Sequence, residues 1–258
     1  MGTNMKPIKL SACALAISAL LVGCSTSTTE SENVKTEAIW ADIYVTSQGE
    51  SSRVIAELNV SSRNGNNIQL SDKDKLEATA AGVTKELEQD DDFFDIDYRA
   101  IFNTAEEDTQ FTVRFVRSET NETLETTLKL PAPIKIITPQ KNQSFYRKET
   151  VEINWTPDDA TDTILDLRLT ITCKNNAGDN TSTGTTVRSI DDDGSYSINL
   201  ETLDGLVDPQ INPKKACEGE VFMERVRHGV LDSKFAESSR ARAIQERYSD
   251  KFEVRLEQ

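Results

Sequence analysis

The sequence predicts an all-β protein with two tandem antiparallel β-sandwich domains, preceded by an N-terminal segment of a different character. Two observations lead to this prediction. Beyond residue 38 the apolar side chains recur at every second position, as they do in strands that bury one face. Turn-forming runs such as Ser47-Gln48-Gly49 and Asn64-Gly65-Asn66-Asn67 interrupt this pattern at short intervals, which is typical of sandwiches.

The N-terminal segment has the composition of a bacterial signal peptide. Lys6 and Lys9 precede an apolar stretch that runs from Leu10 to Val22. A membrane-spanning helix needs about 20 apolar residues, so this stretch is too short to cross a bilayer and has the length of a signal-peptide core. The chain is therefore expected to be exported.

The segment ends in Leu21-Val22-Gly23-Cys24, which resembles the lipobox of bacterial lipoproteins. The resemblance covers residues 5–29. It implies that residues 1–23 are removed as a signal peptide and that Cys24 is acylated, with palmitate among its chains. Several acyl chains anchor a protein stably, since each buried methylene contributes about 0.8 kcal/mol. Ser25 is not the aspartate that retains enteric lipoproteins in the inner membrane, so the outer membrane is expected. An ordinary signal peptide is the alternative.

Residues 24–37 and the remaining cysteines also fit an exported chain. The stretch is rich in Ser, Thr and Glu, which predicts a flexible, lipidated tether. Cys173 and Cys217 are the two cysteines left once Cys13 departs with the signal and Cys24 is acylated. A single pair in an oxidising periplasm has one connectivity, so we expect a structural Cys173–Cys217 disulfide. A zinc site is disfavoured because no histidines neighbour them.

The charge excludes several classes of partner and site. The net charge is −15, and removing the two lysines of the signal lowers it to −17. Nucleic acid is therefore not expected as a partner, because binding its phosphates requires clustered Lys and Arg. The one histidine, His228, makes a multi-histidine metal site or a His-based triad improbable. No cofactor, metal site or catalytic residue is expected.

The first domain is predicted over residues 38–131. Its strands are marked by alternating apolar side chains: Ile39 to Val45, Val54 to Val60, Phe94 to Phe102, Phe111 to Phe115 and Leu124 to Leu130. Residues 75–89 are ambiguous, because Leu76, Ala80, Val83 and Leu87 have helical spacing. Gly82 interrupts that spacing, so we expect a strand over 76–80, a turn, and a second strand over 83–87, with a short helix as the alternative.

Pro131-Ala132-Pro133 marks the predicted joint, because prolines end the preceding strand and stiffen the chain. The second domain, residues 132–258, repeats the alternation in five segments: Val151 to Trp155, Leu165 to Cys173, Tyr196 to Leu200, Cys217 to Met223 and Phe252 to Leu256. Cys173 is in phase with four aliphatic residues, as a buried half-cystine should be. We expect residues 134–258 to fold without the rest of the chain.

A proline, an aromatic residue and a strand with tryptophan open this second domain, at Pro139, Phe145 and Val151 to Trp155. The pattern, with Asp193-Gly194-Ser195-Tyr196 further on, resembles immunoglobulin-like and fibronectin type III modules. The resemblance implies a β-sandwich and says nothing of activity. Residues 202–218 do not fit a minimal module and are expected to form a loop insertion that the disulfide pins.

Several polar clusters are weighed as sites. Asp90-Asp91-Asp92 and Asp191-Asp192-Asp193 are expected to be solvated turns, with weak calcium binding as the alternative. The chain has no nucleophile elbow, phosphate-binding loop or dinucleotide fingerprint, and no pair of carboxylates stands out for glycoside hydrolysis. The arginines of residues 240–247 are expected to balance acidic groups within the molecule.

Two aromatic residues are candidates for a ligand surface. Trp40 and Tyr44 are out of phase with the apolar face of their strand, so they could stack on a ligand ring or cover a contact between the domains.

The sequence thus predicts a periplasm-facing lipoprotein of the outer membrane, held in the lipid bilayer by Cys24, with a non-enzymatic binding or envelope-assembly role. Its expected partner is an envelope protein or a glycan. A carbohydrate- or peptidoglycan-binding module is the alternative, and an enzyme is the third candidate.

Overall fold

The computed structural model describes residues 27–91 and 95–257, and the predicted signal and Cys24 lie outside them. Strands dominate, so the all-β prediction is confirmed. The strands are β1 (Thr28–Glu30), β2 (Ile39–Ser47), β3 (Ser52–Val60), β4 (Asn67–Gln69), β5 (Lys75–Ala80), β6 (Val83–Glu86), β7 (Glu88–Asp91), β8 (Ile96–Phe102), β9 (Gln110–Arg117), β10 (Glu122–Lys129), β11 (Ile136–Thr138), β12 (Ser144–Tyr146), β13 (Thr150–Trp155), β14 (Thr163–Lys174), β15 (Asn180–Ile190), β16 (Ser195–Asn199), β17 (Cys217–His228), β18 (Arg240–Tyr248) and β19 (Phe252–Arg255). The 3-10 turns are η1 (Ser31–Asn33), η2 (Thr36–Ala38), η3 (Leu200–Thr202) and η4 (Asp204–Val207).

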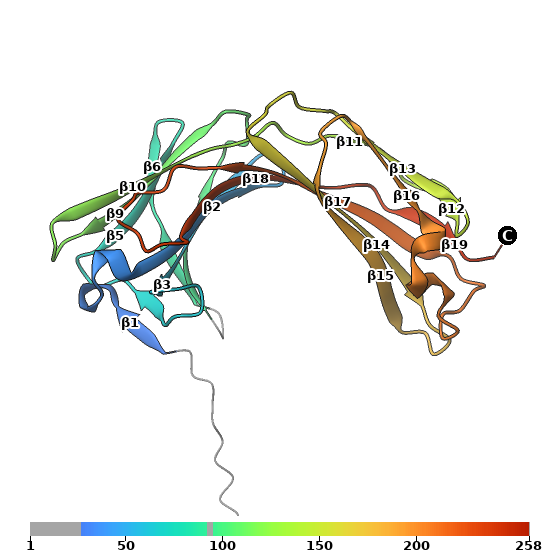
Figure 1. Ribbon diagram of the computed structural model, residues 1–258, viewed down its shortest axis with the longest axis horizontal. Helices are drawn as coiled ribbons and strands as arrows, with labels where there is room; N and C mark the ends of the chain where they lie inside the picture. The colour runs from blue at the N-terminus through green and yellow to red at the C-terminus, as the bar shows by residue number, and fades with distance from the viewer. Residues whose placement is uncertain (1–26, 92–94, 258) are drawn as a thin grey trace, which may run out of the picture.

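One large sheet runs through the whole molecule. Its main path is β1-β4-β3-β2-β18-β17-β14-β15, and β7, β8, β12 and β19 branch from it. A four-stranded sheet, β10-β9-β5-β6, packs on one end of this sheet, and a three-stranded sheet, β11-β13-β16, packs on the other. The described chain forms an arch whose inner side is lined by the large sheet (Figure 1).

The two halves are joined by strand pairing. β18, from the C-terminal half of the sequence, pairs in parallel with β2 in the N-terminal half, from Arg240 opposite Asp42 to Gln245 opposite Ser47. The first hydrophobic core therefore contains Phe235, Ala241 and Ala243 beside residues from Val34 to Leu130. The predicted second domain, 132–258, thus supplies one strand and three core residues to the sandwich of the predicted first domain, 38–131.

Sequence alternation explains most of the first core. Ile39, Ala41, Ile43 and Val45 of β2 are all at most 1% exposed, because a strand sends alternate side chains to one face. The ambiguous segment forms the predicted hairpin of β5 and β6. Ala81 and Gly82 both have positive φ, 48° and 77°, as a two-residue turn of the favoured hairpin type requires.

The second core is drawn from residues 134–254 and contains the disulfide. Cys173 on β14 and Cys217 on β17 are bonded, with Cα atoms 4.3 Å apart, so the predicted bridge is confirmed. Both cysteines are 2% exposed. Trp155 is also 2% exposed, and its indole Nε1 donates to Asp192 Oδ1 at 2.7 Å. It is a core residue, as its phase predicted.

The expected flexible tether over residues 24–37 does not extend through its described part. β1 pairs with β4, and Ser31 and Thr36 are at most 3% exposed. The reason is Arg117 of β9, which is 1% exposed and donates to Thr36 Oγ1 and to the carbonyl oxygens of Ser31 and Val34, each at 2.7 Å. A buried guanidinium needs such partners, so the polar segment is bound rather than free.

Two further arginines lie where the halves meet. Arg225 of β17 is fully buried; it forms a bidentate pair with Asp192, at 2.7 and 2.9 Å, and donates to Ala132 O. Arg227 donates to Leu130 O and pairs with Asp108 and Asp162. Arg225 thus bonds to a carbonyl within the predicted proline-rich joint, and Arg227 to the carbonyl of the residue before it. Through these bonds, loops of both halves are connected to β17.

Candidate functional site

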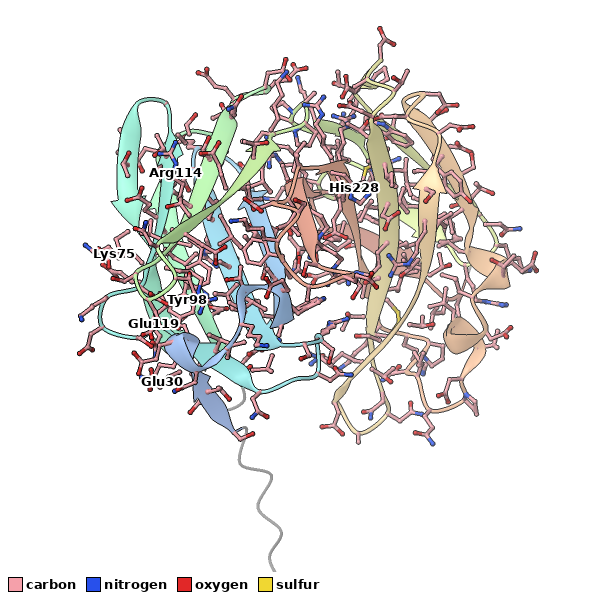
Figure 2. The ribbon with its side chains drawn as sticks, turned by 60° about the vertical axis from the view of Figure 1, so that its left-hand side comes forward. Glu30, Lys75, Tyr98, Arg114, Glu119 and His228 are labelled. Atoms are coloured by element: carbon pink, nitrogen blue, oxygen red, sulfur yellow. A yellow bond between two sulfur atoms is a disulfide. The ribbon has the colours of Figure 1, made fainter. Side chains whose placement is uncertain are left out.

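Within residues 27–91 and 95–257, no second sheet covers one face of the large sheet. On β17 and β18 the odd-numbered residues Val221, Met223 and Ala243 belong to the two cores. Both small sheets therefore cover the same side, and the even-numbered residues face the inside of the arch. His228 lies on this inner face, at the end of β17 near the middle of the molecule (Figure 2). We call the even-numbered surface of β17 and β18, with its neighbours on β14 and β2, the inner face.

Three carboxylates form a row across the inner face. Asp166 of β14 lies opposite Glu224 of β17, which in turn lies opposite Glu246 of β18. Burial raises the pKa of Glu224, and Glu246 and then Asp166 raise it further. Like charges at directly opposite positions destabilise a sheet. The repulsion is partly offset, because Asp166 pairs with Arg188 at 2.9 Å and Glu246 accepts from Gln48 at 2.7 Å. Such an arrangement is suited to a partner that brings hydrogen-bond donors or positive charge.

An aromatic row lies beside the acidic one. Phe222 of β17 is opposite Tyr248 of β18, with ring centroids 4.6 Å apart. The Arg168 guanidinium lies over the Phe222 ring at 4.8 Å. Tyr248 is 50% exposed, so its ring is available to solvent. An exposed tyrosine next to carboxylates and an arginine can stack on a flat or ring-shaped ligand while its neighbours form polar contacts.

On the other side of the carboxylates lies an apolar row. Ile164 of β14 faces Val226 of β17, which faces Ile244 of β18. Ile164 is 39% exposed, whereas Ile244 is only 6% exposed. Along β17, the inner face therefore presents an aromatic, an acidic and an apolar row. Each row crosses from β17, which contributes to the second core, to β18, which contributes to the first.

The predicted pair Trp40 and Tyr44 also lies on this side of the sheet, but Trp40 is not exposed. The Trp40 ring is 2% exposed; its Nε1 donates to Ser238 O, and Arg240 lies over it at 5.8 Å. No face of Trp40 is free for a ligand, so it does not stack on one. Its contacts with Ser238 and Arg240, from the predicted second domain, fit the other alternative, a contact between the predicted domains. Tyr44 is half-buried beside Arg242, and burial raises its pKa, followed by Asp97 and Asp42.

The same contacts account for the arginines of β18. Arg240 and Arg242 both pair with Asp42, at 2.5 and 2.8 Å, and Arg247 donates to Ser47 O. Arg240 and Arg242 thus balance an acidic group within the molecule, as expected, whereas Arg247 donates to backbone carbonyl oxygens. Sequence reasoning missed the exposed platform because Phe222 and Tyr248 are far apart in the chain. The sequence indicated this surface only in one way: Phe222 alternates with the core residues Val221 and Met223, which places it on the opposite face of the strand.

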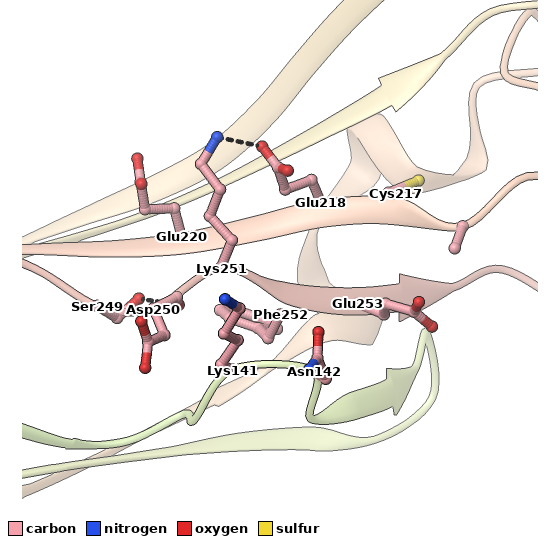
Figure 3. A pocket seen from close by; sticks show the side chains of 11 residues that line it. Lys141, Asn142, Cys217, Glu218, Glu220, Ser249, Asp250, Lys251, Phe252 and Glu253 are labelled. Carbon is pink, nitrogen blue, oxygen red and sulfur yellow. Dashed lines mark hydrogen bonds and ion pairs between the residues drawn. The ribbon is translucent and has the colours of Figure 1, made fainter.

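A cavity of about 660 Å³ lies near the disulfide (Figure 3). Lys141, Lys251, Glu218 and Glu220 are among its lining residues. Lys251 donates to Glu218 at 2.6 Å, and the Cys217 sulfur is held in the disulfide. The cavity therefore offers charged groups that are partly paired with each other, and its cysteine is no free nucleophile.

The acidic turns differ in their contacts. Asp192 is bonded to Arg225 and Trp155, so this carboxylate serves the core. Asp90 pairs with Arg99. Within residues 27–91 and 95–257 no cluster of three or more potential ligands is placed to hold a metal ion. No helix in this part of the chain is long and apolar enough to cross a membrane.

Comparison with known proteins leaves the family open. No protein-family model matches the chain, and no curated protein does. Fibronectin(III)-like modules of Clostridium thermocellum CbhA are 13% identical over 84% of this chain and 91% of theirs, with a TM-score of 0.22. A two-domain fibronectin type III segment of chicken tenascin is 11% identical over 81% of this chain and 98% of its own, with a TM-score of 0.21.

Titin domains z1z2, solved in complex with telethonin, are 9% identical over 87% of this chain and all of theirs, with a TM-score of 0.23. These neighbours are of the fibronectin III and immunoglobulin-like class, the class that the sequence of the second half resembles. Superpositions with such low scores carry no argument about function. The sandwich architecture rests on the strands and cores of this chain.

Proposed function

We propose that the protein is a lipid-anchored lipoprotein of the outer membrane, facing the periplasm, and that it binds an envelope partner on its inner face without catalysing a reaction. One observation carries the binding role: a single sheet spans both halves, and the described chain leaves one of its faces uncovered, with the exposed Tyr248 ring beside the half-buried Phe222 and apolar side chains on it. Exposed apolar groups rimmed by polar ones are typical of interaction sites.

The bound N-terminal segment favours this arrangement at a membrane. The described chain is docked from Thr28 onward, four residues after Cys24. Four extended residues span about 14 Å at most, so an acylated Cys24 would keep the first sandwich close to the lipid surface. The carboxylate of Glu122 contributes to the docking by accepting from Thr36 and Lys234. Lys234 and then Thr36 lower the pKa of Glu122 to about 2.

The anchor is tested by replacing its thiol. Cys24→Ala should abolish labelling by a palmitate analogue and move the protein from the membrane fraction to the soluble fraction. Cys24→Ser serves as a second variant of nearly the same size and should behave identically. Unchanged membrane association of both variants would contradict the lipoprotein proposal, whatever the inner face binds.

The binding surface is tested by photocrosslinking in cells with the full chain. A photoreactive phenylalanine analogue at Tyr248, on the inner face, should give a discrete adduct with an envelope component. The same analogue at Tyr196, which lies half-buried on β16 of the covering sheet, is the matched control and should give none. Equal adducts at the two positions, or no adduct at Tyr248, would contradict the assignment of the inner face.

Glycan binding is the second candidate, and the Phe222–Tyr248 pair favours it. Sugar rings stack on exposed aromatic faces, and carboxylates and guanidinium groups bond to their hydroxyls. Isolated peptidoglycan sacculi should then sediment the protein, and Tyr248→Ala should weaken this binding by about tenfold, with Tyr196→Ala as the control. Failure of sacculi to bind would remove the glycan candidate while leaving a protein partner open to the crosslinking test.

A further inference from the structure

The large sheet ends in a long strand whose outer edge has no partner. β15 (Asn180–Ile190) pairs with β14 on one side only, and no other strand of the described chain lies against its outer side (Figure 1). Every residue of β15 is exposed or half-buried. No backbone hydrogen bond connects its outer edge to another described segment. An edge of this kind presents a row of free N–H and C=O groups to another strand.

Over residues 180–187, β15 lacks the features that keep sheet edges apart; its end, by contrast, has a bulge, Arg188 and the positive-φ Ser189. From Asn180 to Val187 it carries no charged side chain and no proline. The edge strand β6 has Lys85 and Glu86 within four residues, and the edge strand β10 has two glutamates and a lysine. Proteins commonly place charges on edge strands to prevent edge-to-edge pairing. In a chain with a net charge of −15, an uncharged edge of this length favours association there.

We propose that β15 is a dimerisation surface that takes the β15 of a second copy, antiparallel, so that two large sheets become one. A second copy fits better than an unrelated strand because the segment is complementary to itself. When Thr185 lies on the two-fold axis, the uncharged residues from Thr183 to Val187 lie opposite one another, so no charges face each other in the centre of the pairing. The pairing uses the free edge of both copies, and the assembly therefore closes as a dimer.

The consequence is a doubled inner face. Ser182, Gly184 and Thr186 continue the inner face of β14, since they lie opposite Thr172, Thr170 and Arg168. Two copies paired through β15 would present one continuous polar surface between their two aromatic rows. The pairing itself does not depend on the function proposed above, because it rests on the edge of β15 alone.

A cysteine scan of the full-length protein tests the proposal. Single cysteines at positions 182, 183, 185, 186 and 187 are oxidised, and the covalent dimer is quantified. Gly184 is left unchanged because a Cβ there would lie 2.1 Å from the carbonyl oxygen of Leu169. Because directly opposed Cβ atoms lie about 5 Å apart and the separation grows quickly along an antiparallel pair, a two-fold pairing predicts one sharp maximum, near Thr185. Thr84→Cys, on the exposed edge strand β6, and the chain without an added cysteine are the controls.

A charge variant gives an independent measurement. Thr186→Lys places two like charges near the two-fold axis on the exposed inner side, so sedimentation equilibrium should show a dimer dissociation constant about tenfold higher. Thr84→Lys should leave the dissociation constant unchanged. A flat crosslinking profile, equal crosslinking at Thr84→Cys, a monomer at every concentration, or crosslinks only to a different protein would each overturn the proposal.

Discussion

The two sandwiches differ in how their cores are assembled from the chain. The second core draws on residues 134–254 alone and is cross-linked by Cys173–Cys217. The first core combines residues 34–130 with Phe235, Ala241 and Ala243, which arrive more than a hundred residues later. The second sandwich can therefore form from one stretch of chain, whereas the first is complete only after β18 has paired with β2.

This difference shows that a position in the sequence and a position in the fold need not coincide. β17 belongs to the second core through Val221 and Met223 and continues into the junction through Arg225 and Arg227. β18 then returns along β17 into the first sandwich. The joint between the halves is therefore a rigid hairpin shared by both, in addition to the proline-bearing segment.

The largest expected effect comes from separating the halves. A fragment of residues 27–131 lacks β18, leaves the edge of β2 unpaired and loses three core residues, so we expect it not to unfold cooperatively. A fragment of residues 132–258 keeps the whole second core and should unfold cooperatively in urea, followed by circular dichroism. Adding the two fragments together should restore structure to the first. Cooperative unfolding of the 27–131 fragment by itself would refute the comparison.

The next effect concerns the buried arginine of the junction. Arg225→Ala leaves the half-buried Asp192 without its charged partner and removes the donor to the carbonyl oxygens of Ala132 and Thr156, so it should lower the free energy of unfolding by about 3–5 kcal/mol. Arg255→Ala, an exposed arginine on β19, is the control and should cost less than about 1 kcal/mol. Similar losses for both variants in urea unfolding would mean that Arg225 does not hold the junction.

Removing the disulfide should weaken the second sandwich. The bridge closes a loop with a sequence separation of 44, and the double variant Cys173→Ala/Cys217→Ala should lose about 2–5 kcal/mol. Near-ultraviolet circular dichroism and hydrogen exchange should show this loss in β14 and β17 more than in β5 and β9. Uniform destabilisation of all these strands would show instead that the two cores unfold as a single unit.

The smallest effect is a gain in stability at the inner face. Burial, Glu246 and Asp166 raise the pKa of Glu224, so its ionised form is disfavoured in the folded state. Glu224→Gln should raise the free energy of unfolding at pH 7 by about 0.5 kcal/mol.

The pH dependence of the stability difference between the wild-type chain and Glu224→Gln provides a separate test of its sign. The folded state holds the Glu224 proton to higher pH than the unfolded state, so the wild-type chain loses stability as the pH rises through this interval. The advantage of Glu224→Gln should therefore vanish below about pH 4. Glu107→Gln, at an exposed loop position, is the control. A destabilised Glu224→Gln variant at neutral pH would contradict the repulsion argument.

The sequence predicted the strands whose apolar residues alternate and missed several that do not follow that rule, among them β15 and β18. β15 is a run of Ser and Thr with little apolar character. β18 alternates arginine with alanine, and its small core residues gave a weak hydrophobic signal. The prediction of a free tether was wrong for a related reason. Ser31 and Thr36 are polar, yet both are buried, because Asp74 accepts from the Ser31 hydroxyl and Arg117 donates to Thr36 Oγ1 and to the Ser31 carbonyl.

The candidate site shows the same limit. The phase of Trp40 correctly placed it on the face away from the core. Its burial under Arg240 and Ser238 depended on a strand 200 residues away. Tyr248 and Phe222 became a platform only through the register of β17 with β18. Phase along one strand is local, whereas exposure depends on which strands lie beside it.

The sequence by itself therefore determined the β class, the hairpin at Ala81 and Gly82 and the disulfide partners, because alternation, turn chemistry and cysteine count are local or combinatorial. Only the tertiary structure decided that β18 completes the first sandwich, that the inner face is uncovered and that β15 lies at its edge. The physical reason is that strand pairing joins backbone groups present in every residue. The choice of neighbour then depends on how all the side chains pack together.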